Sequence, residues 1–325
     1  KRIDAPRKFE PKEFEAKSAG YTSKEVEFKC GGARLAGTLT IPDKAAPRPA
    51  VLLVAGSGPD GRDCMGLFHS IADHLTKNGF CVLRYDPRGI GQSTGNPQAT
   101  GDAEHAADCA AALEFLSSQK EVDAGKVSVI GHLDGAYYAA MAAGAEGANV
   151  NRIALMSPQF FPEKLYDTKF DLLKGLAGSY GWSDEYLKTA MRSILETIEK
   201  ADAAKDGKAP ILGYKCFAGK VAERARADSR RVISGLDMPV LIMQSTGEDP
   251  LNIDSSAALD ETLTLDGKKR HMLVYFSYLG TWFGSKVNDG ISRIRYSADS
   301  TALQSIRDWL GMDFTPEETP KTGIN

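Results

Sequence analysis

The decapeptide VSVIGHLDGA, residues 127–136, joins an apolar run to a run of small residues through two glycines four positions apart. The apolar run predicts a buried strand at residues 127–130, and the small residues predict a helix from 134 to about 145. Glycine at positions 131 and 135 fits a turn so sharp that side chains there would collide with the neighbouring strand and helix. The stretch therefore predicts a strand–turn–helix unit with Leu133 at the tip of the turn.

Strands and helices alternate on both sides of this unit. Residues 25–30 and 34–41 alternate in polarity around Gly31-Gly32, which predicts a β-hairpin. Further strands are expected at residues 51–55, 81–85, 153–156, 239–244 and 272–276, and helices at residues 65–78, 102–118 and 300–310. Because strands that alternate with helices imply βαβ units, the sequence predicts an α/β fold with a mostly parallel sheet.

This alternation is interrupted once. Residues 160–236 show helical patterns only and are far too long for an ordinary connection, so we expect them to form an inserted helical cap. The core is then expected at residues 22–159 and 237–312. Residues 1–21 are charged and lack periodicity, which predicts an extended arm, and residues 313–325 are expected to form a polar, mobile tail.

Composition excludes several classes of function. The chain has 325 residues, with 40 Lys and Arg against 43 Asp and Glu, and this balance gives no electrostatic footprint for nucleic acid or an anionic membrane. Its apolar runs are too short for a transmembrane helix. Five scattered cysteines without a CxxC pair predict neither a disulfide framework nor a structural zinc site, and no metal or cofactor is expected.

The sequence is compatible with more than one cellular compartment. The cysteine set fits a reducing compartment better than an oxidising one, although one disulfide beside free thiols would also fit. The chain starts at Lys1, and we expect that an upstream segment was removed. A cleaved organellar targeting peptide, or a signal peptide for a periplasmic or secreted protein, is one such segment.

Four motifs in order carry a family resemblance: VAGSGP at 54–59, RYDPRGIGQSTG at 84–95, GHLDGA at 131–136 and LGTWFG at 279–284. Over residues 22–312 the chain resembles the α/β-hydrolase superfamily, and most closely its branch of esterases and acyl-peptidase-like serine hydrolases. The resemblance implies the α/β-hydrolase fold, with a mostly parallel central sheet of about eight strands, flanking helices and an inserted cap. The turn at 131–135 then corresponds to the G-x-S-x-G nucleophile elbow.

The resemblance also implies that the catalytic triad has been lost. The family's serine falls on Leu133, its histidine on Thr281, and its acid on Glu248 or the adjacent Asp249. Leucine has no lone pair with which to attack a carbonyl, and threonine is no general base near neutral pH. We therefore expect a vestigial triad without an intact catalytic residue, since the three members work as a unit.

The pocket positions implied by the resemblance are Ser57 and Gly58 for the oxyanion hole, with Asp134 and Trp282 beside them. Asp134 as a displaced nucleophile would break the glycine spacing. Two further side chains near the elbow, His132 and Cys64, are expected to be a packed histidine and a buried, inert cysteine. The Arg84–Gly95 segment is interpreted as a structural turn. The Gly-rich loop Gly56-Ser57-Gly58 matches neither GK[ST] nor GxGxxG, so nucleotide binding is not expected.

The elbow itself allows two alternatives. A serine at this position sits in a strained backbone conformation, which Leu133 tolerates poorly. Either the turn has relaxed, or Leu133 fills the former oxyanion pocket as a plug.

Three functional hypotheses follow. The first is a catalytically inactive pseudoenzyme that serves as a structural or interaction subunit in a larger assembly with protein partners. The second is a binding or sensing protein that holds an apolar small molecule in the capped pocket, lined by Tyr137, Tyr138, Trp182, Trp282 and Phe283. The third is an esterase or peptidase-like enzyme that uses non-standard residues, namely Asp134, His132 or Cys64.

Overall fold

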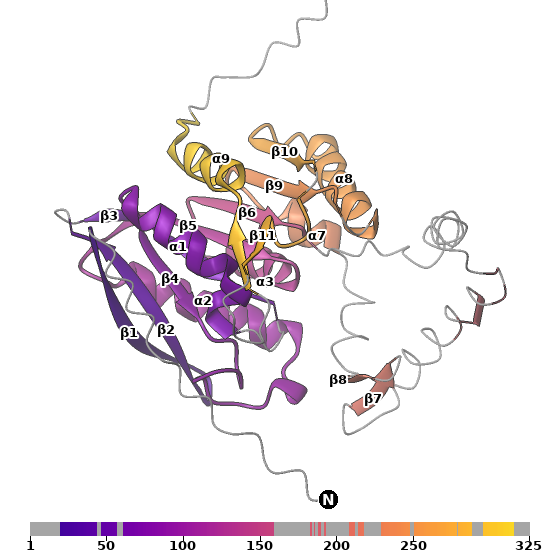
Figure 1. The fold of residues 1–325 in the computed structure, drawn as a ribbon, viewed down its shortest axis with the longest axis horizontal. Helices are drawn as coiled ribbons and strands as arrows, with labels where there is room; N and C mark the ends of the chain where they lie inside the picture. Colours follow the sequence, from indigo (N-terminus) through magenta and orange to yellow (C-terminus); the bar gives the residue numbers. More distant parts are fainter. Residues whose placement is uncertain are drawn as a thin grey trace, which may run out of the picture.

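A computed structural model describes residues 20–43, 47–56, 61–158, 183, 185, 188–189, 192, 208–211, 214–217, 229–247, 250–277, 279–287 and 295–314. An eight-stranded sheet in the order β1-β2-β4-β3-β5-β6-β9-β10 forms its centre (Figure 1). The strands are β1 (Tyr21–Cys30), β2 (Ala33–Pro42), β3 (Arg48–Val54), β4 (Cys81–Tyr85), β5 (Val122–His132), β6 (Arg152–Met156), β9 (Val240–Ser245) and β10 (His271–Phe276). β1 and β2 pair antiparallel, as do β2 and β4, and every other pair is parallel.

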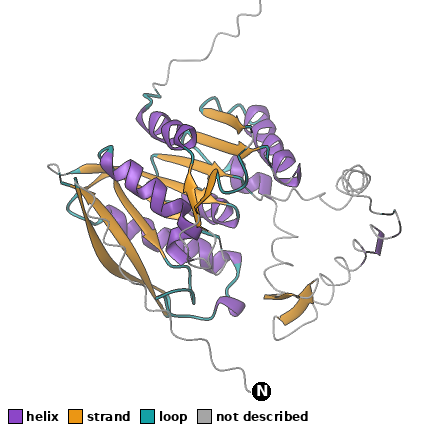
Figure 2. Cartoon of the chain, in the orientation of Figure 1, coloured by secondary structure: helices purple, strands orange, loops and turns teal. Residues whose placement is uncertain are grey.

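Helices cover both faces of the sheet, as Figure 2 shows. One face packs against α1 (Leu67–Lys77) and α9 (Ser300–Gly311), with Phe68, Ile71, Ile306 and Trp309 among the buried side chains. The opposite face packs against α2 (Asp102–Ser117), α3 (Asp134–Ala143), α7 (Ser229–Ser234) and α8 (Pro250–Leu265). The result is a three-layer α/β/α arrangement with two apolar cores, one on each side of the sheet.

This architecture confirms the predicted fold class and the predicted α/β-hydrolase arrangement of about eight strands. The hairpin around Gly31-Gly32 is β1–β2, and the closing helix is α9. Val51, Leu52 and Leu53 are completely buried, which explains why the apolar run at 51–55 carries no alternation. None of the helices in the described ranges is long and apolar enough to cross a membrane.

Three expectations about organisation need correction. The stretch expected to be purely helical contains two short strands, β7 (Lys208–Ile211) and β8 (Tyr214–Phe217), which pair antiparallel. Strands of four residues are too short for the two-residue alternation of polarity to be recognised in the sequence. α7 also falls within this stretch, yet Ile233 is buried in the main core, so the core resumes before residue 237. Tyr21, assigned to the arm, is the first residue of β1.

Another antiparallel strand pair was not expected either. β11 (Gly284–Val287) and β12 (Arg295–Ala298) pair antiparallel after the LGTWFG segment. The Tyr296 ring stacks on the Trp282 ring with centroids 5.1 Å apart. A side chain at Gly66 would lie 2.7 Å from the carbonyl oxygen of Tyr296, so the hairpin packs directly against the segment that precedes α1. The expected cap otherwise lies almost wholly outside the described residues, as does the tail beyond Phe314.

Candidate functional site

The turn between β5 and α3 holds Leu133 in a strained conformation. Its backbone angles are φ 53° and ψ −122°, in the region that favours glycine. The Leu133 N–H donates to the carbonyl oxygen of Met156 on β6 at 3.0 Å, and the Leu133 carbonyl accepts from the Ala136 N–H at 3.0 Å. The alternative of a relaxed elbow is therefore wrong, because the turn keeps the sharp geometry although a leucine occupies its tip.

Close approach of main chains explains both glycines of this turn. A Cβ on Gly135 would lie 2.1 Å from the carbonyl oxygen of Val54 at the end of β3. A Cβ on Gly131 would lie 2.4 Å from the carbonyl oxygen of Gly135 and 2.5 Å from the Cα of Ala136. Side chains cannot occupy such spaces, so these two glycines let β3, β5 and α3 meet at the elbow. The neighbours, rather than residue 133, hold the turn in shape.

His132 lies next to the tip, with only 1% of its surface exposed. Its Nε2 is 2.8 Å from the main-chain carbonyl oxygen of Thr281, and its Nδ1 is 3.5 Å from Cys64 Sγ. Because a carbonyl oxygen can only accept, Nε2 carries the proton and Nδ1 is the acceptor for the Cys64 thiol. The imidazole thus faces Cys64 and Thr281, as expected for a packed histidine.

Burial keeps this imidazole neutral. Desolvation lowers the pKa of His132 to about 4, although the hydrogen bond to the Thr281 carbonyl raises it slightly. Aromatic rings surround the imidazole, with centroids at 5.2 Å for Trp282, 6.4 Å for Phe68 and 6.5 Å for Phe283. Near neutral pH, His132 is therefore an uncharged hydrogen-bonding group inside an apolar cluster.

The partner thiol belongs to a segment with unusual backbone angles. Cys64 has φ 47° and the next residue, Met65, has φ 53°, both in the left-handed region. Cys64 is 5% exposed, so its burial is as predicted. Its contact with His132 spans 68 residues of sequence, and no spacing pattern in the sequence could have indicated it.

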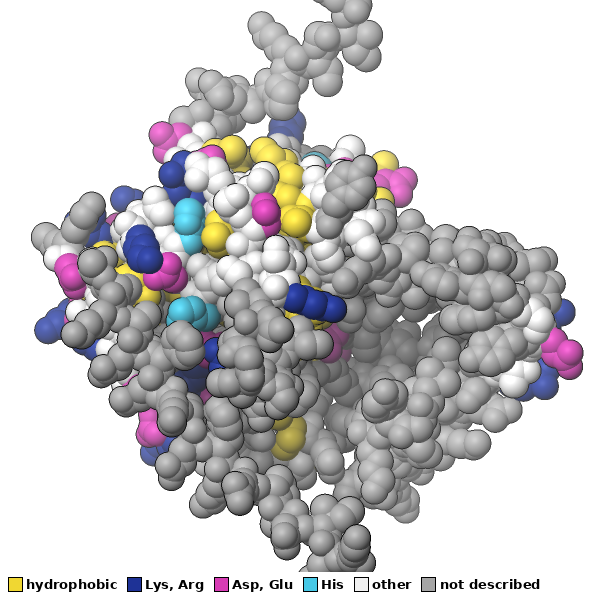
Figure 3. Space-filling model, viewed as in Figure 1, with side chains coloured by type: hydrophobic (Ala, Val, Ile, Leu, Met, Phe, Trp, Pro, Cys, Tyr) yellow, Lys and Arg dark blue, Asp and Glu magenta, His cyan; other side chains and the backbone are white. Residues whose placement is uncertain are grey.

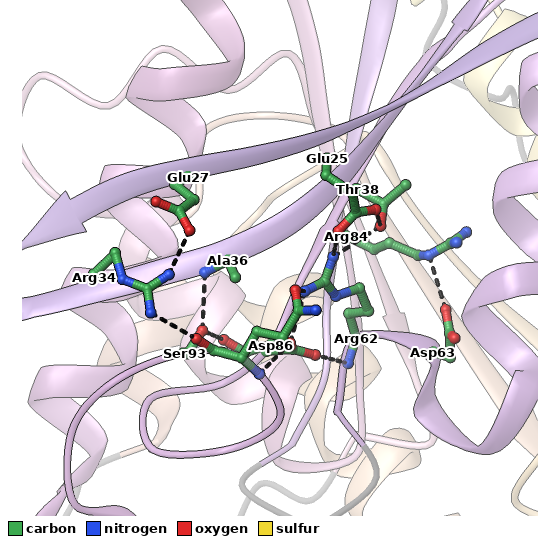
Figure 4. Close-up of polar contacts among 11 residues, drawn as sticks. Glu25, Glu27, Arg34, Ala36, Thr38, Arg62, Asp63, Arg84, Asp86 and Ser93 are labelled. Carbon is green, nitrogen blue, oxygen red and sulfur yellow. Dashed lines mark hydrogen bonds and ion pairs between the residues drawn. The ribbon is translucent and has the colours of Figure 1, made fainter. Parts of the chain in front are cut away.

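A buried ion pair anchors this same segment (Figure 4). The Arg62 guanidinium donates from Nη2 to Asp86 Oδ2 at 2.8 Å, and the Arg62 main-chain N–H donates to Asp86 Oδ1 at 2.9 Å. Asp86 follows β4 and also accepts from the Gln92 N–H at 2.9 Å. Arg62 reaches the β1–β2 hairpin as well, through Glu25 at 2.6 Å and Thr38 at 2.9 Å.

The Asp86 network agrees with the interpretation of residues 84–95 as a structural turn. Ser93 Oγ donates to the Asp86 carbonyl at 2.7 Å and accepts from the Ala36 N–H at 3.0 Å. Arg88 pairs with Asp108 of α2, whose side chain is 1% exposed. All these polar groups bond main chain or one another, which positions the loops around the elbow.

Four of the expected site residues are described. Leu133 and Asp134 lie at the tip of the turn and at the start of α3, and both are half-buried. Thr281 supplies its carbonyl oxygen to His132, and the half-buried Trp282 ring packs between His132 and Tyr296. The expected positions Ser57, Gly58, Glu248 and Asp249 lie outside the described residues, and the plug alternative therefore stays a prediction.

Three of the five aromatic residues expected to line a ligand pocket are buried in the core. Tyr137, Tyr138 and Phe283 are at most 2% exposed. The two tyrosines lie in the core on the α2 and α3 face of the sheet, and Phe283 lies in the core on the opposite face. The three side chains are thus divided between the two cores, and Trp182 lies outside the described residues. Within the part of the chain that the structure describes, no three His, Cys, Asp or Glu side chains gather to hold a metal.

Sheet order, three layers and the strand–turn–helix unit around Leu133 together define the α/β-hydrolase class. Residues 45–273 match the model of the family described as serine aminopeptidase, S33, and the chain belongs to this family. The match extends across the sheet from β3 to β10.

Curated relatives support the same class. Esterase EstD of Thermotoga maritima is 32% identical over 176 residues, which are 53% of this chain and 40% of that protein. Thiohydrolase apmlB of Arthrinium phaeospermum is 32% identical over 126 residues, 38% of this chain and 39% of that protein. The chain thus spans about two fifths of the length of each relative that it matches.

Solved structures confirm the fold. Est1E from Butyrivibrio proteoclasticus, solved with ferulic acid, aligns with a TM-score of 0.61 at 14% identity, covering 88% of this chain and 97% of that one. DcsB in complex with a substrate analogue aligns with a TM-score of 0.60 at 18% identity, covering 89% and 99%. At such low identity the likeness shows the fold alone.

Proposed function

We propose that this α/β-hydrolase has lost serine hydrolysis and acts as a non-catalytic structural or interaction subunit. The observation that carries the proposal is Leu133, which occupies the tip of an intact elbow at φ 53° and ψ −122°. A hydrocarbon side chain at this position can neither attack a carbonyl carbon nor release a proton. The framework around the turn persists without the group that it holds in related enzymes.

The position of the general base supports the same proposal. Thr281 stands where the resemblance places the family's histidine, and it contributes its main-chain carbonyl to His132. The His132 imidazole cannot replace the missing base at the elbow, because both of its nitrogens are engaged by Thr281 and Cys64. The fold is preserved although its site lacks both a nucleophile and a base. This supports a role in which the surface of the protein binds partners.

Turnover of an activated ester such as 4-nitrophenyl acetate tests the loss of catalysis. The wild-type chain is expected to show no saturable turnover, and its rate should equal the rates of Leu133→Ala and Cys64→Ala. Saturable turnover by the wild-type chain would overturn the proposal. The native mass in a gentle extract tests the interaction role, with other proteins expected in fixed ratio to this chain. If only copies of this chain migrate together, the interaction role fails.

A second candidate rests on the pair of Cys64 Sγ and His132 Nδ1 at 3.5 Å. In a thiol-dependent esterase, Nδ1 would take the thiol proton as Sγ attacks the ester carbon. The proton would then pass to the leaving alkoxide as the C–O bond breaks, and water would hydrolyse the thioester. Burial of both groups disfavours the charged pair, so this candidate ranks second. Saturable turnover lost in Cys64→Ala but kept in Leu133→Ala would establish it.

A further inference from the structure

The segment that follows α9 packs against the end of this helix. Met312 has extended backbone angles of φ −66° and ψ 138°, and its N–H donates to the carbonyl oxygen of Trp309 at 3.2 Å. The Phe314 ring meets the Trp309 ring edge to face, with centroids 6.3 Å apart. Trp309 is 1% exposed and is the largest fully buried side chain among the described residues. Residues 312–314, here called the strap, therefore cover part of the core on the α9 face.

A side chain from a distant part of the sequence contacts both the strap and the helix. Arg152 is the first residue of β6, and its Nη1 donates to the Trp309 carbonyl oxygen at 2.8 Å. The guanidinium carbon lies 5.0 Å from the centroid of the Phe314 ring and 5.9 Å from the centroid of the Trp309 ring. One guanidinium group thus contacts the end of the helix, a ring of the core and a ring of the strap.

The chemistry of arginine suits this position. The last carbonyl groups of a helix lack donors within the helix and carry partial negative charge, so a cation is stabilised beside them. A planar guanidinium can stack on aromatic faces while it donates hydrogen bonds from its edge. The Arg152 Nε donates to Asn151 Oδ1 at 3.0 Å, which helps to fix the plane of the group. Lysine has the charge but no planar face, so it cannot make the same set of contacts.

The strap lies at the surface of the molecule. Met312 is 38% exposed, and Arg152 and Phe314 are half-buried. Figure 3 shows hydrophobic side chains at the surface over the region of α9, next to charged ones. Burial lowers the pKa of Arg152 and the exposed Asp313 carboxylate raises it, but an arginine keeps its charge near neutral pH in either case. Water can therefore reach the strap without any opening of the sheet.

The other end of α9 is anchored independently of the strap. The Asp299 carboxylate accepts from the Thr301 N–H at 2.8 Å and caps the helix, and the Asp299 N–H donates to the Phe283 carbonyl at 2.7 Å. Further along the helix, Ala302 and Ile306 are each 1% exposed within the core. None of these contacts involves Arg152 or residues 312–314. Release of the strap therefore leaves most of α9 attached to the sheet.

We propose that Arg152 holds the strap closed over the end of α9, and that the strap opens as a local unit while the rest of the fold stays closed. Opening uncovers the Trp309 ring and frees the chain from Met312 onward. Arg152 begins β6, whose last residue, Met156, accepts the hydrogen bond from Leu133, so the strap and the elbow lie at opposite ends of this strand. The inference goes beyond the proposed function, because the strap works whether or not the chain has lost catalysis.

Hydrogen exchange of the purified full chain, resolved by peptide with mass spectrometry, tests the strap. Arg152→Met removes the donor and the stacking, so amide exchange in residues 309–314 is expected to become about tenfold faster or more. Peptides from β5 and α3 should exchange as in the wild type. Arg152→Lys keeps only the charge and is expected to speed exchange in residues 309–314 as well. Arg307→Met is the matched control on the same helix, because the Arg307 side chain is 38% exposed, and it should change nothing in residues 309–314.

Phe314→Ala keeps the proposal falsifiable if Arg152→Met fails to fold. It removes only the outer ring and is expected to speed exchange in residues 309–313, whereas Phe314→Tyr keeps a ring and should match the wild type. Unchanged exchange in Arg152→Met and Phe314→Ala would overturn the proposal. Equal acceleration in the strap, β5 and α3 would also overturn it, because the opening would then be global. These results are independent of ester turnover and of the proteins found in an extract, so the inference and the proposed function can fail separately.

Discussion

His132 and Thr281, 149 residues apart in the sequence, are joined by a hydrogen bond of 2.8 Å from the imidazole Nε2 to the main-chain carbonyl oxygen. The bond links the end of β5 to the segment after β10. Because Thr281 contributes a main-chain atom, the identity of its side chain does not decide whether the bond forms.

Replacement of His132 by leucine should therefore destabilise the fold by about 2 kcal/mol, since a buried carbonyl loses its donor. Urea unfolding measures the change. Thr281→Ala keeps the acceptor and is the matched control, expected to cost about 0.5 kcal/mol or less. Equal losses in the two variants would contradict the role assigned to this bond.

Stability should also depend on pH through His132. Its pKa falls from the ordinary 6.5 to about 4 on folding, because burial penalises the charged imidazole. Between these values the unfolded chain binds more protons, so the free energy of unfolding is highest above pH 6.5 and falls as pH drops toward 4. The contribution is on the order of 3 kcal/mol.

Burial also lowers the pKa of His69 and His74, which adds a change in the same direction. The difference between wild type and His132→Leu isolates the part due to His132. Urea unfolding at pH 7 and pH 5 should show a smaller loss on acidification for the variant. An unchanged loss would mean that His132 is protonated in the folded state at pH 5.

The Arg62–Asp86 pair is expected to stabilise the loops around the elbow. Arg62→Met leaves the Asp86 carboxylate buried, with its side chain 6% exposed, and without its cationic partner. We expect a loss of about 3 kcal/mol in the free energy of unfolding. Arg34→Met is the matched control. Arg34 lies on β2, in the hairpin that Arg62 also contacts, and its pair with Glu27 of β1 (Figure 4) is exposed, with side-chain exposures of 41% and 60%. An exposed pair contributes about 0.5 kcal/mol, so similar losses in both variants would contradict this account.

Gly135 should tolerate no side chain. Alanine there would place a Cβ 2.1 Å from the Val54 carbonyl oxygen, so β3 and α3 would have to move apart. We expect the free energy of unfolding to fall by about 3 kcal/mol or more, or the variant to fail to fold. Gly32→Ala meets no atom within 4 Å and should fold normally. Thermal unfolding of the soluble fraction compares the two, and a stable Gly135→Ala protein would contradict the close approach at the elbow.

Periodicity and glycine spacing were sufficient to predict the main sheet. The run at 51–55 and the glycines at 131 and 135 encode burial and close approach locally, so each can be recognised in a short window of sequence. β7, β8, β11 and β12 have four residues each, too few for a period of two to be distinguished. Their pairing depends on tertiary contacts that a single sequence does not display.

The environment of the elbow was only partly predictable. The resemblance identified Leu133 and Thr281 by their position within motifs, and the structure places Leu133 at the turn. The contact between Cys64 and His132 depends on two backbone residues with positive φ before α1, at Cys64 and Met65. Neither residue type favours that conformation, so the sequence carries no local indication that the thiol turns toward the imidazole.

The β1 edge of the sheet has a consequence for aggregation. Lys24, Glu25, Glu27 and Lys29 are exposed along this strand, and charged side chains on an edge strand discourage pairing with a strand of another chain. The long β1–β2 hairpin can therefore lie at the border of the sheet without offering a template on which a fibre could start.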